Sequence, residues 1–264
     1  IRNTSPAQFR AEFECEFLGS VLTLINASKL KSMAYVKPQQ ERDDGLKIYE
    51  EPIDGHMYFM GVDVSRGQEI DYHATTIIDM TETPYRVVAQ YRNNKMPPFL
   101  LPNMLYPMAK KYNDAYMMIE INDIGQEISD ILHNDMEYEN LLTTSVRGRK
   151  GQIMDGGFGN FDTQRGIRMS PKVKRVGCAM LKELIENDKM LVQDYHIINE
   201  LASFVSKKQS YEAEVGHHDD LVTTMILFAW CSTQPYFKDL TDINIRDKLY
   251  KEKIEKLEEE LMPF

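Results

Sequence analysis

Carboxylates stand at the ends of three apolar segments of this sequence, where an uncompensated charge is costly. Asp63 lies near the end of the run from Tyr58 to Val64, and Glu120 lies near the end of the run from Ala115 to Ile121. An Asp-Asp pair at 219–220 directly precedes a third apolar run. Because a buried carboxylate needs a cation or hydrogen-bond donors beside it, these three positions together predict a site for divalent cations.

Each of these carboxylates also has a purely structural explanation. Asp63 could cap the turn that follows it, and Glu120 could occupy a half-exposed edge of a sheet. Either aspartate of the 219–220 pair could cap the helix that follows. We expect one of the pair to cap and the other to bind metal, with Asp219 as the direct ligand and Asp220 assisting. Asp71, eight residues after Asp63, is a further candidate ligand that also suits a solvated loop.

The residue types around the acidic pair indicate which metal to expect. His217 and His218 directly precede the pair and would suit zinc. Carboxylate oxygens, however, are the ligands that Mg²⁺ and Mn²⁺ prefer. We therefore expect Mg²⁺ or Mn²⁺, with the histidines supporting the site or contacting nucleic acid. The cysteines, Cys15, Cys178 and Cys231, are odd in number and lack metal-type spacing, which indicates neither a disulfide framework nor a structural zinc site.

The elements that must hold these carboxylates alternate between strands and helices. Strands are predicted at residues 58–64, 74–80, 85–91, 115–121 and 140–144, and helices from about 99 to 112, 125 to 133, 171 to 187 and 221 to 230. Short connections make the first three strands antiparallel neighbours. Pro102 and Pro107 predict a late start or a kink in the first helix, and Ser170-Pro171 is a typical helix start. The fold class is therefore α/β, a mixed sheet flanked by helices.

The net charge of −10 argues against a general nucleic-acid coat, but it hides a basic stretch between residues 147 and 175. This stretch has eight bases and two acids, a local charge of +6, so the rest of the chain carries −16. The bases are Arg147, Arg149, Lys150, Arg165, Arg168, Lys172, Lys174 and Arg175. Such segregation predicts a binding site for a polyanion.

Residues 145–170 contain six glycines and no periodicity, which suits a disordered insertion or a functional loop. Their charge favours function. The segment from Gly156 to Phe161 is a weak nucleotide motif, because it lacks the Gly-Lys-Ser/Thr ending of a P-loop and no strand leads into it. Phe158 and Phe161 could stack on bases or pack locally.

We expect one main domain over residues 51–235, because 264 residues with 42% hydrophobic residues can bury one sizeable core. Residues 1–50 are predicted to form an attachment segment. Residues 236–264 are predicted to form an amphipathic helical tail, which either packs on the domain or docks a partner. The first residue is not methionine, which suits a fragment of a longer protein. No apolar run approaches the roughly 20 residues of a membrane span, so we expect no membrane contact and a cytoplasmic location.

The order Asp63, Glu120, Asp219 on a first strand, a fourth strand and a late helix resembles the ribonuclease H-like nucleases. Three motifs carry a closer resemblance: Gly-Val-Asp63-Val-Ser-Arg-Gly, Met-Met-Ile-Glu120-Ile-Asn-Asp and Gly-His-His-Asp219-Asp220-Leu-Val. They are similar to the nuclease domain of the large terminase subunit of T-even-like tailed bacteriophages, over most of residues 50–235. This resemblance implies a ribonuclease H-like fold and a metal-dependent endonuclease of low sequence specificity. Such an enzyme cuts concatemeric double-stranded viral DNA to begin and end the filling of a capsid.

The resemblance also implies roles and partners. Asp63 would bridge two metal ions, Glu120 would hold one and help to orient a water molecule, and Asp219 would hold the other. The basic stretch would hold the backbone of double-stranded DNA. Residues 1–50 would be the hinge from a preceding ATPase domain. Further partners would be the portal ring, the small terminase subunit and the motor assembly. The protein would act at the capsid portal in the cytoplasm of the infected cell and would be absent from the mature virion.

The sequence lacks a P-loop and the acidic strand that follows one, so we expect no packaging ATPase in this chain. Two alternatives stay open. A junction resolvase or transposase-like nuclease of the same fold would prefer branched to linear DNA. An actin-like or sugar-kinase-like nucleotide-binding domain is a different class, suggested because Asp63-Val-Ser-Arg-Gly loosely mimics a phosphate-binding loop. That fold needs a second such loop, which the sequence does not show. A binding scaffold without activity would not need all three acids.

Overall fold

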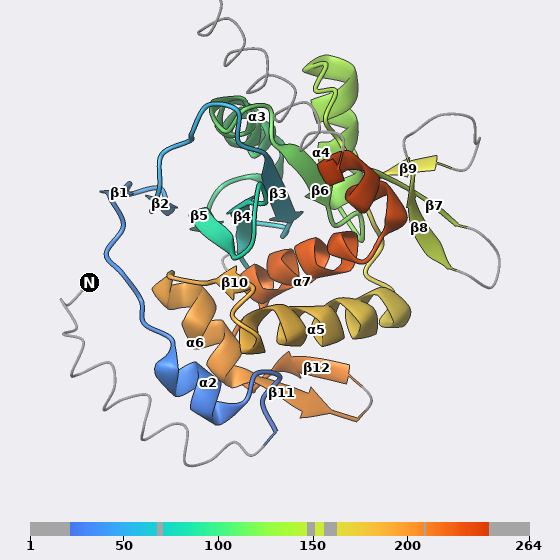
Figure 1. Cartoon of the computed structure of the whole chain (residues 1–264). Helices are drawn as coiled ribbons and strands as arrows, with labels where there is room; N and C mark the ends of the chain where they lie inside the picture. The colour runs from blue at the N-terminus through green and yellow to red at the C-terminus, as the bar shows by residue number, and fades with distance from the viewer. Residues whose placement is uncertain (1–21, 68–70, 147–150, 156–162, 209, 243–264) are drawn as a thin grey trace, which may run out of the picture.

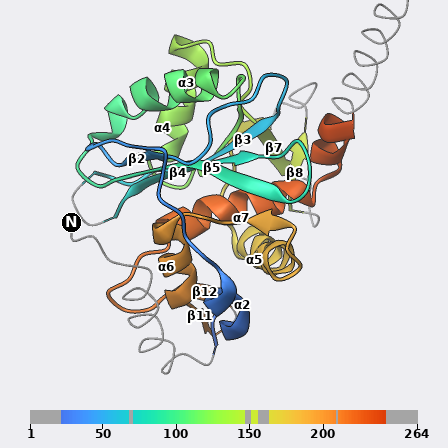
Figure 2. The same cartoon turned by 60° about the vertical axis from the view of Figure 1, so that its left-hand side comes forward.

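A mixed seven-stranded sheet lies between two layers of helices in the computed structural model of this chain (Figures 1 and 2). The structure describes residues 22–67, 71–146, 151–155, 163–208 and 210–242. The strands of this sheet are β1 (Gln40–Glu41), β2 (Leu46–Ile48), β3 (Tyr58–Asp63), β4 (His73–Asp79), β5 (Tyr85–Asn93), β6 (Tyr116–Ile119) and β10 (Met190–Leu191). Their order is β1-β2-β5-β4-β3-β6, with β10 beside β5.

The pairing of the central strands confirms the predicted sheet. β3, β4 and β5 are antiparallel neighbours, and β6 runs parallel to β3 on its other side. β10 pairs in parallel with β5. Because β3 and β6 are parallel, their carboxyl ends meet at the same edge of the sheet, which is where the first two candidate ligands stand.

Two helical layers cover the two faces of the sheet (Figure 2). The helices are α2 (Ala27–Ser32), α3 (Pro102–Lys111), α4 (Gly125–Asp130), α5 (Pro171–Glu186), α6 (Tyr195–Ser203) and α7 (Asp220–Ser232), with the short turns η1 (Pro98–Leu100) and η2 (Ile131–Asp135). One hydrophobic core, with Met60, Leu105 and Ile128, lies under α3 and α4. The other, with Phe59 and Ile226, lies under α5, α6 and α7. Strands covered on both faces read as continuous apolar runs, which is what β3 shows.

The predicted helix starts are confirmed where the signal is local. Pro102 is the first residue of α3, with Pro107 inside it, so the helix starts late as expected. Ser170 caps α5, its Oγ accepting a hydrogen bond from the Val173 N–H at 3.3 Å, and Pro171 follows at the first helical position.

α7 is buried along nearly its whole length and lies between the sheet and α5. It approaches β3 at Gly61, where an added Cβ would lie 2.7 Å from the Thr224 carbonyl oxygen. A hydrogen bond of 2.8 Å between the Thr76 and Thr224 hydroxyls ties α7 to β4. Glycine at this position therefore lets the helix lie directly on the strand, so that the start of α7 reaches the edge where β3 ends.

Residues 143–165 differ from the expected loop. Their described part contains β7 (Thr143–Val146), β8 (Gln152–Asp155) and β9 (Thr163–Arg165), which form a small sheet in the order β8-β7-β9. Of the predicted fifth strand, residues 140–144, Leu141 forms a single parallel bridge with Met117, and the last two residues begin β7 of this small sheet. The hairpin of β11 (Phe204–Lys207) and β12 (Ser210–Ala213) was likewise not predicted. Short polar strands of this kind are set by their cross-strand partners and not by local periodicity.

The terminal segments bear on the predicted domain boundaries. Leu24, Ile25 and Leu30 are buried in the core under α5–α7, and β2 pairs with β5. The described part of residues 1–50 thus packs into the main body, and the division of the chain near residue 50 stays a prediction. Of the predicted tail, residues 236–242 are helical and the remainder lies outside the described residues. No helix within the described ranges is long and apolar enough to span a membrane.

Candidate metal centre

Asp63 and Glu120 occupy matching positions at the ends of two parallel strands. Val62 pairs in register with Ile119, and the Glu120 N–H donates to the Val62 carbonyl oxygen at 2.9 Å. Asp63 and Glu120 therefore follow as the next pair in this register. The structure brings together two residues that are 57 positions apart in sequence, as the resemblance implied.

Asp219, at the start of α7, lines the same cavity as Asp63 and Glu120. It is the residue that precedes the first turn, and its carbonyl oxygen accepts the Thr223 N–H at 2.8 Å. Its side chain makes no capping hydrogen bond in the described structure. The expectation that one aspartate of the pair caps the helix is wrong, because a residue from another helix takes that place.

That residue is Glu200 of α6, which the sequence analysis did not single out. Its Oε2 accepts the N–H groups of Leu221 at 2.8 Å and Val222 at 3.1 Å. Its side chain is almost fully buried, and Oε1 lies 3.4 Å from Arg92 Nη2. Burial raises the pKa of Glu200 to about 8, with Arg92 acting in the opposite direction. A glutamate in the apolar stretch Ile197 to Leu201 was the available sequence signal, because buried glutamates need partners.

The carboxylates open onto one cavity of about 420 Å³. Its acidic lining residues are Asp63, Asp71, Glu120, Asp123, Asp219 and Asp220. Among the described residues that line it, two are basic, Arg66 and Lys174. Every residue predicted as a ligand thus faces the same space, including Asp71, which comes from the connection between β3 and β4.

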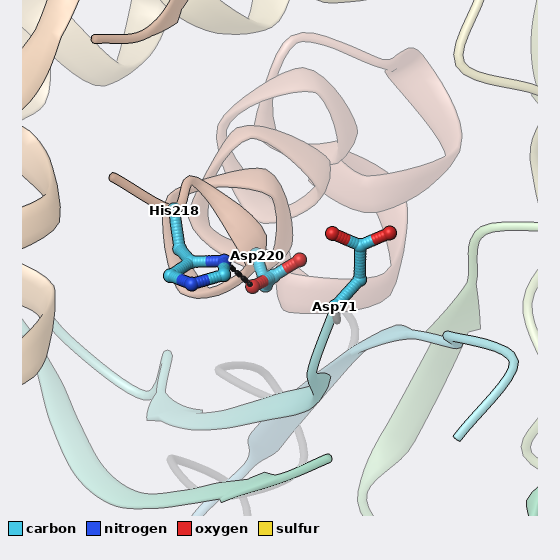
Figure 3. A group of neighbouring side chains, drawn as sticks. All are labelled: Asp71, His218 and Asp220. Carbon is cyan, nitrogen blue, oxygen red and sulfur yellow. Dashed lines mark ion pairs between the residues drawn. The ribbon is translucent and has the colours of Figure 1, made fainter. Parts of the chain in front are cut away.

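Asp71, His218 and Asp220 form a tighter group within this site (Figure 3). Each offers a ligand atom, and these atoms lie within 4.8 Å of one another. His218 Nδ1 lies 3.5 Å from Asp220 Oδ2, while the Tyr72 ring packs edge-on against His218 at 5.0 Å between centroids. His217 is exposed and outside this group. His218, expected to support the site or contact nucleic acid, is therefore also placed as a potential ligand.

Burial, together with the crowding of negative charge, raises the pKa values of these carboxyl groups. Burial raises the pKa of Asp63 well above its ordinary value, and the charges of Glu120, Asp220 and Asp219 raise it further. Burial also raises the pKa of Glu120 to about 7, although Lys174 opposes this, and it raises the pKa of Asp220 to about 6. Carboxylates held in this way favour any divalent cation that enters, because it replaces protons and relieves repulsion.

The two basic residues have different partners. Arg66 forms a bidentate ion pair with Asp123, at 2.6 Å and 2.8 Å, between the loops that follow β3 and β6. Both side chains are largely exposed. Lys174, in the first turn of α5, lies 3.7 Å from Asp219 Oδ2 and over the Phe204 ring. The acidic cavity is therefore lined by one cation from the loop after β3 and another from α5.

The basic stretch lies partly within the described structure. Arg165 ends β9, Arg168 and Lys172 are exposed close to the start of α5, and Arg175 is exposed on α5 itself. Lys174 reaches the cavity. Arg147, Arg149 and Lys150, and both phenylalanines of the glycine-rich segment, lie outside the described residues. The described bases are thus close in sequence to a cavity-lining lysine, and their role in DNA binding stays a prediction.

The sheet order and the acidic groups at the ends of β3, β6 and the start of α7 define a ribonuclease H-like domain with a carboxylate site. A family model described as a terminase RNaseH-like domain matches residues 60–229, well over half of the chain. The chain belongs to this family. The expected fold class and the predicted terminase resemblance are both confirmed, while the T-even-like subgroup stays a prediction.

Solved structures with the same fold include the large terminase nuclease of thermophilic phage G20c with bound magnesium, at 20% identity and a TM-score of 0.59. The match covers 80% of this chain and 97% of that one. The cobalt-bound form of that nuclease has 18% identity and a TM-score of 0.58, with the same coverage of the two chains. The large terminase nuclease domain of Thermus phage P74-26 has 20% identity and a TM-score of 0.54, and the match covers 76% of this chain and 91% of that one. At these identities the likeness concerns the fold.

Proposed function

We propose that this chain is the nuclease of a phage DNA-packaging terminase, a metal-dependent endonuclease that cuts concatemeric double-stranded DNA when packaging begins and ends. The observation that carries the proposal is the convergence of Asp63, Glu120 and Asp219 on one acidic cavity in a chain of the terminase RNaseH-like family. The metal-bound structures of the G20c nuclease support metal dependence.

The donor set fits a hard divalent cation. Six carboxylates and, among the described residues, two bases line the cavity. The pKa values of three of the carboxylates are raised, so a cation that replaces their protons would be favoured. Oxygen ligands favour Mg²⁺ or Mn²⁺ over softer metals. Two such ions would supply the electrophilic stabilisation of the charge that develops on a phosphodiester during hydrolysis.

The residues of the chain would then divide the remaining work. Asp63 lies among the charges of Glu120, Asp219 and Asp220, and it would hold the ions together with Glu120 and Asp219. Asp220 and Asp71, with His218 beside them, would complete the coordination on one side. Lys174 and Arg66 line the cavity and would contact phosphate oxygens of the bound DNA. Phosphate contacts of this kind position DNA without reading its sequence, so cutting would be poorly selective.

The proposal extends to partners and to location. Double-stranded DNA is the proposed substrate, and the portal ring, the small terminase subunit and the motor assembly are the proposed partners at the capsid portal in the infected cell. ATP hydrolysis would come from a separate domain, as expected from the missing P-loop.

Cleavage of supercoiled plasmid by the full chain tests the proposal, with Mg²⁺, Mn²⁺ or EDTA present and Asp63→Asn as the control. We expect nicking with either metal and none in EDTA or in the variant. ATP hydrolysis on the same preparation should stay at background. Metal-dependent ATPase activity that disappears in Asp63→Asn, without nicking, would favour the actin-like alternative. Faster cutting of a four-way junction than of linear duplex would favour a resolvase.

A further inference from the structure

The aspartate that precedes α7 does not do what aspartate usually does at the start of a helix. Aspartate before the first turn normally accepts a backbone N–H of the second or third helical residue, which leaves its carboxylate committed. Asp219 stands at that position without such a bond. The N–H groups that it would accept belong to Leu221 and Val222, and both donate instead to Glu200 Oε2.

Glu200 is held firmly enough to serve as a cap from outside the helix. Its side chain is buried, with 3% of its surface exposed, and Arg92 at the end of β5 lies against its other oxygen. The Arg92 guanidinium lies 3.7 Å from the centroid of the Tyr72 ring, on the loop that precedes β4. The Tyr72 ring in turn contacts His218. α6, β5 and this loop therefore support the start of α7 together.

We propose that Glu200 is a positioning residue that caps α7 in place of Asp219, so that the Asp219 carboxylate stays available to a metal ion in the cavity. The inference rests on the proposed function. The carboxylates of Glu200 and Asp219 compete for the same two N–H groups at the start of α7. The one that does not accept them is available to the cavity. In the absence of Glu200, Asp219 would turn back onto its own helix, because exposed N–H groups at a helix start are strongly attractive to a carboxylate.

Metal binding provides the first test. Calorimetric titration of the full chain with Mn²⁺ would compare wild type, Glu200→Ala, Glu200→Gln and Tyr138→Phe. We expect Glu200→Ala to weaken Mn²⁺ binding by about 10- to 100-fold, the usual effect of removing a residue that supports a ligand. Glu200→Gln keeps an acceptor oxygen and should restore most of the affinity. Tyr138→Phe removes a buried hydrogen bond to the Ala115 carbonyl oxygen, in the core on the other face of the sheet, so it should lower the Tm and leave Mn²⁺ affinity unchanged.

The thermal stability of metal-free protein provides a second test, and its first comparison does not need the Glu200 variants to fold. If Glu200 is the cap, Asp219→Ala in EDTA should not lower the Tm of the wild-type background. Ser170→Ala, which removes a side-chain cap from α5, should lower it. In the Glu200→Ala background, Asp219→Ala should now lower the Tm further, because Asp219 has become the cap.

These outcomes separate this inference from the proposed function. Wild-type protein that binds no Mn²⁺ would overturn the proposed function. Wild-type protein that binds Mn²⁺, together with Glu200→Ala protein that binds it equally well, would overturn only the positioning role. A fall in Tm for Asp219→Ala as large as that for Ser170→Ala would also overturn it.

Discussion

The two ends of the central sheet each hold an aspartate at the end of a buried strand, in opposite electrostatic surroundings. Asp63 ends β3, and Asp79 ends the antiparallel neighbour β4, so they lie at opposite ends. Asp79 is 3% exposed and has a full set of partners. Arg86 Nη2 lies 2.7 Å and His56 Nδ1 2.8 Å from its Oδ2, while the Thr81 hydroxyl donates to Oδ1.

The pKa values record this difference. Burial raises the pKa of Asp79, but hydrogen bonds from His56 and Thr81 outweigh it, so the pKa is lowered overall. At Asp63 burial raises the pKa, and the neighbouring carboxylates raise it further. Side chains of the protein compensate the charge of Asp79, whereas Asp63 needs a bound cation to compensate its charge. An aspartate at a strand end becomes a candidate metal ligand only when its neighbours fail to compensate it.

Substitution at the uncompensated end should have the largest effect on activity. We expect Asp63→Asn to reduce plasmid cleavage by roughly a thousandfold or more, which corresponds to about 4 kcal/mol less transition-state stabilisation. The circular dichroism spectrum should be unchanged, because no partner inside the protein loses its counter-charge. Glu120→Gln and Asp219→Asn should behave alike. Retention of more than a tenth of the activity in any of the three would remove that residue from the site.

At the compensated end, Asp79→Ala should act on stability. Removing one partner of a buried ion pair typically costs about 3–5 kcal/mol, and the cost here should lie at the lower end, because Arg86 keeps its ion pair with Glu50. Urea unfolding in EDTA should therefore show a large decrease in stability for Asp79→Ala and none for Asp63→Asn. The specific activity of folded Asp79→Ala protein, measured well below its Tm, should match wild type. Equal decreases in stability at the two ends would contradict the comparison.

The two ends should also respond oppositely to pH. The pKa of Glu120 is raised from 4.5 to about 7, so the folded state holds this proton more tightly than the unfolded state does. The metal-free protein should then become less stable as pH rises from about 4.5 to about 7, by about 3 kcal/mol from this group. The lowered pKa of Asp79 has the opposite sign, and its contribution disappears as pH falls below 3.8.

Thermal melts from pH 5 to 8 in EDTA would measure this effect. Glu120→Gln should make the decrease smaller without abolishing it, because Glu200 and Asp220 also have raised pKa values. Saturating Mg²⁺ should also make it smaller, because the ion replaces protons in the cavity. A wild-type profile that is as flat in EDTA as in Mg²⁺ would show that the carboxylates do not repel one another in the metal-free protein.

The smallest expected effect concerns DNA affinity. Arg168→Glu should change how DNA binding depends on salt. The slope of the logarithm of the binding constant against the logarithm of the salt concentration should decrease in magnitude by roughly 0.9, the value for one phosphate that is no longer neutralised. Lys111→Glu is the matched control, because Lys111 pairs with Glu51 on another part of the surface. It changes the net charge equally and should leave the slope unaltered. Binding of duplex to Asp63→Asn protein, measured by fluorescence anisotropy at several salt concentrations, avoids cleavage during the assay.

Much of the sheet and several helix starts could be predicted because they depend on residues that are close in sequence. The strands around Asp63 and Glu120 are continuous apolar runs, and the start of α5 follows from the adjacent Ser170 and Pro171. The small sheet of β7, β8 and β9 was missed because its strands are short, polar and separated by glycines. Glu200 was missed for a related reason: its partners lie 21 and 22 residues further along the chain, on another helix.

By itself, the sequence determined which carboxylates are available, which strands and helix carry them, and that an excess of acid needs a cation. Those properties depend on residue type and on spacing within one element. Only the tertiary structure decided which aspartate is neutralised and which is not, because the charge beside a carboxylate comes from other elements. Arg86 and His56 compensate Asp79, while Glu200 takes the helix cap and leaves Asp219 facing the cavity.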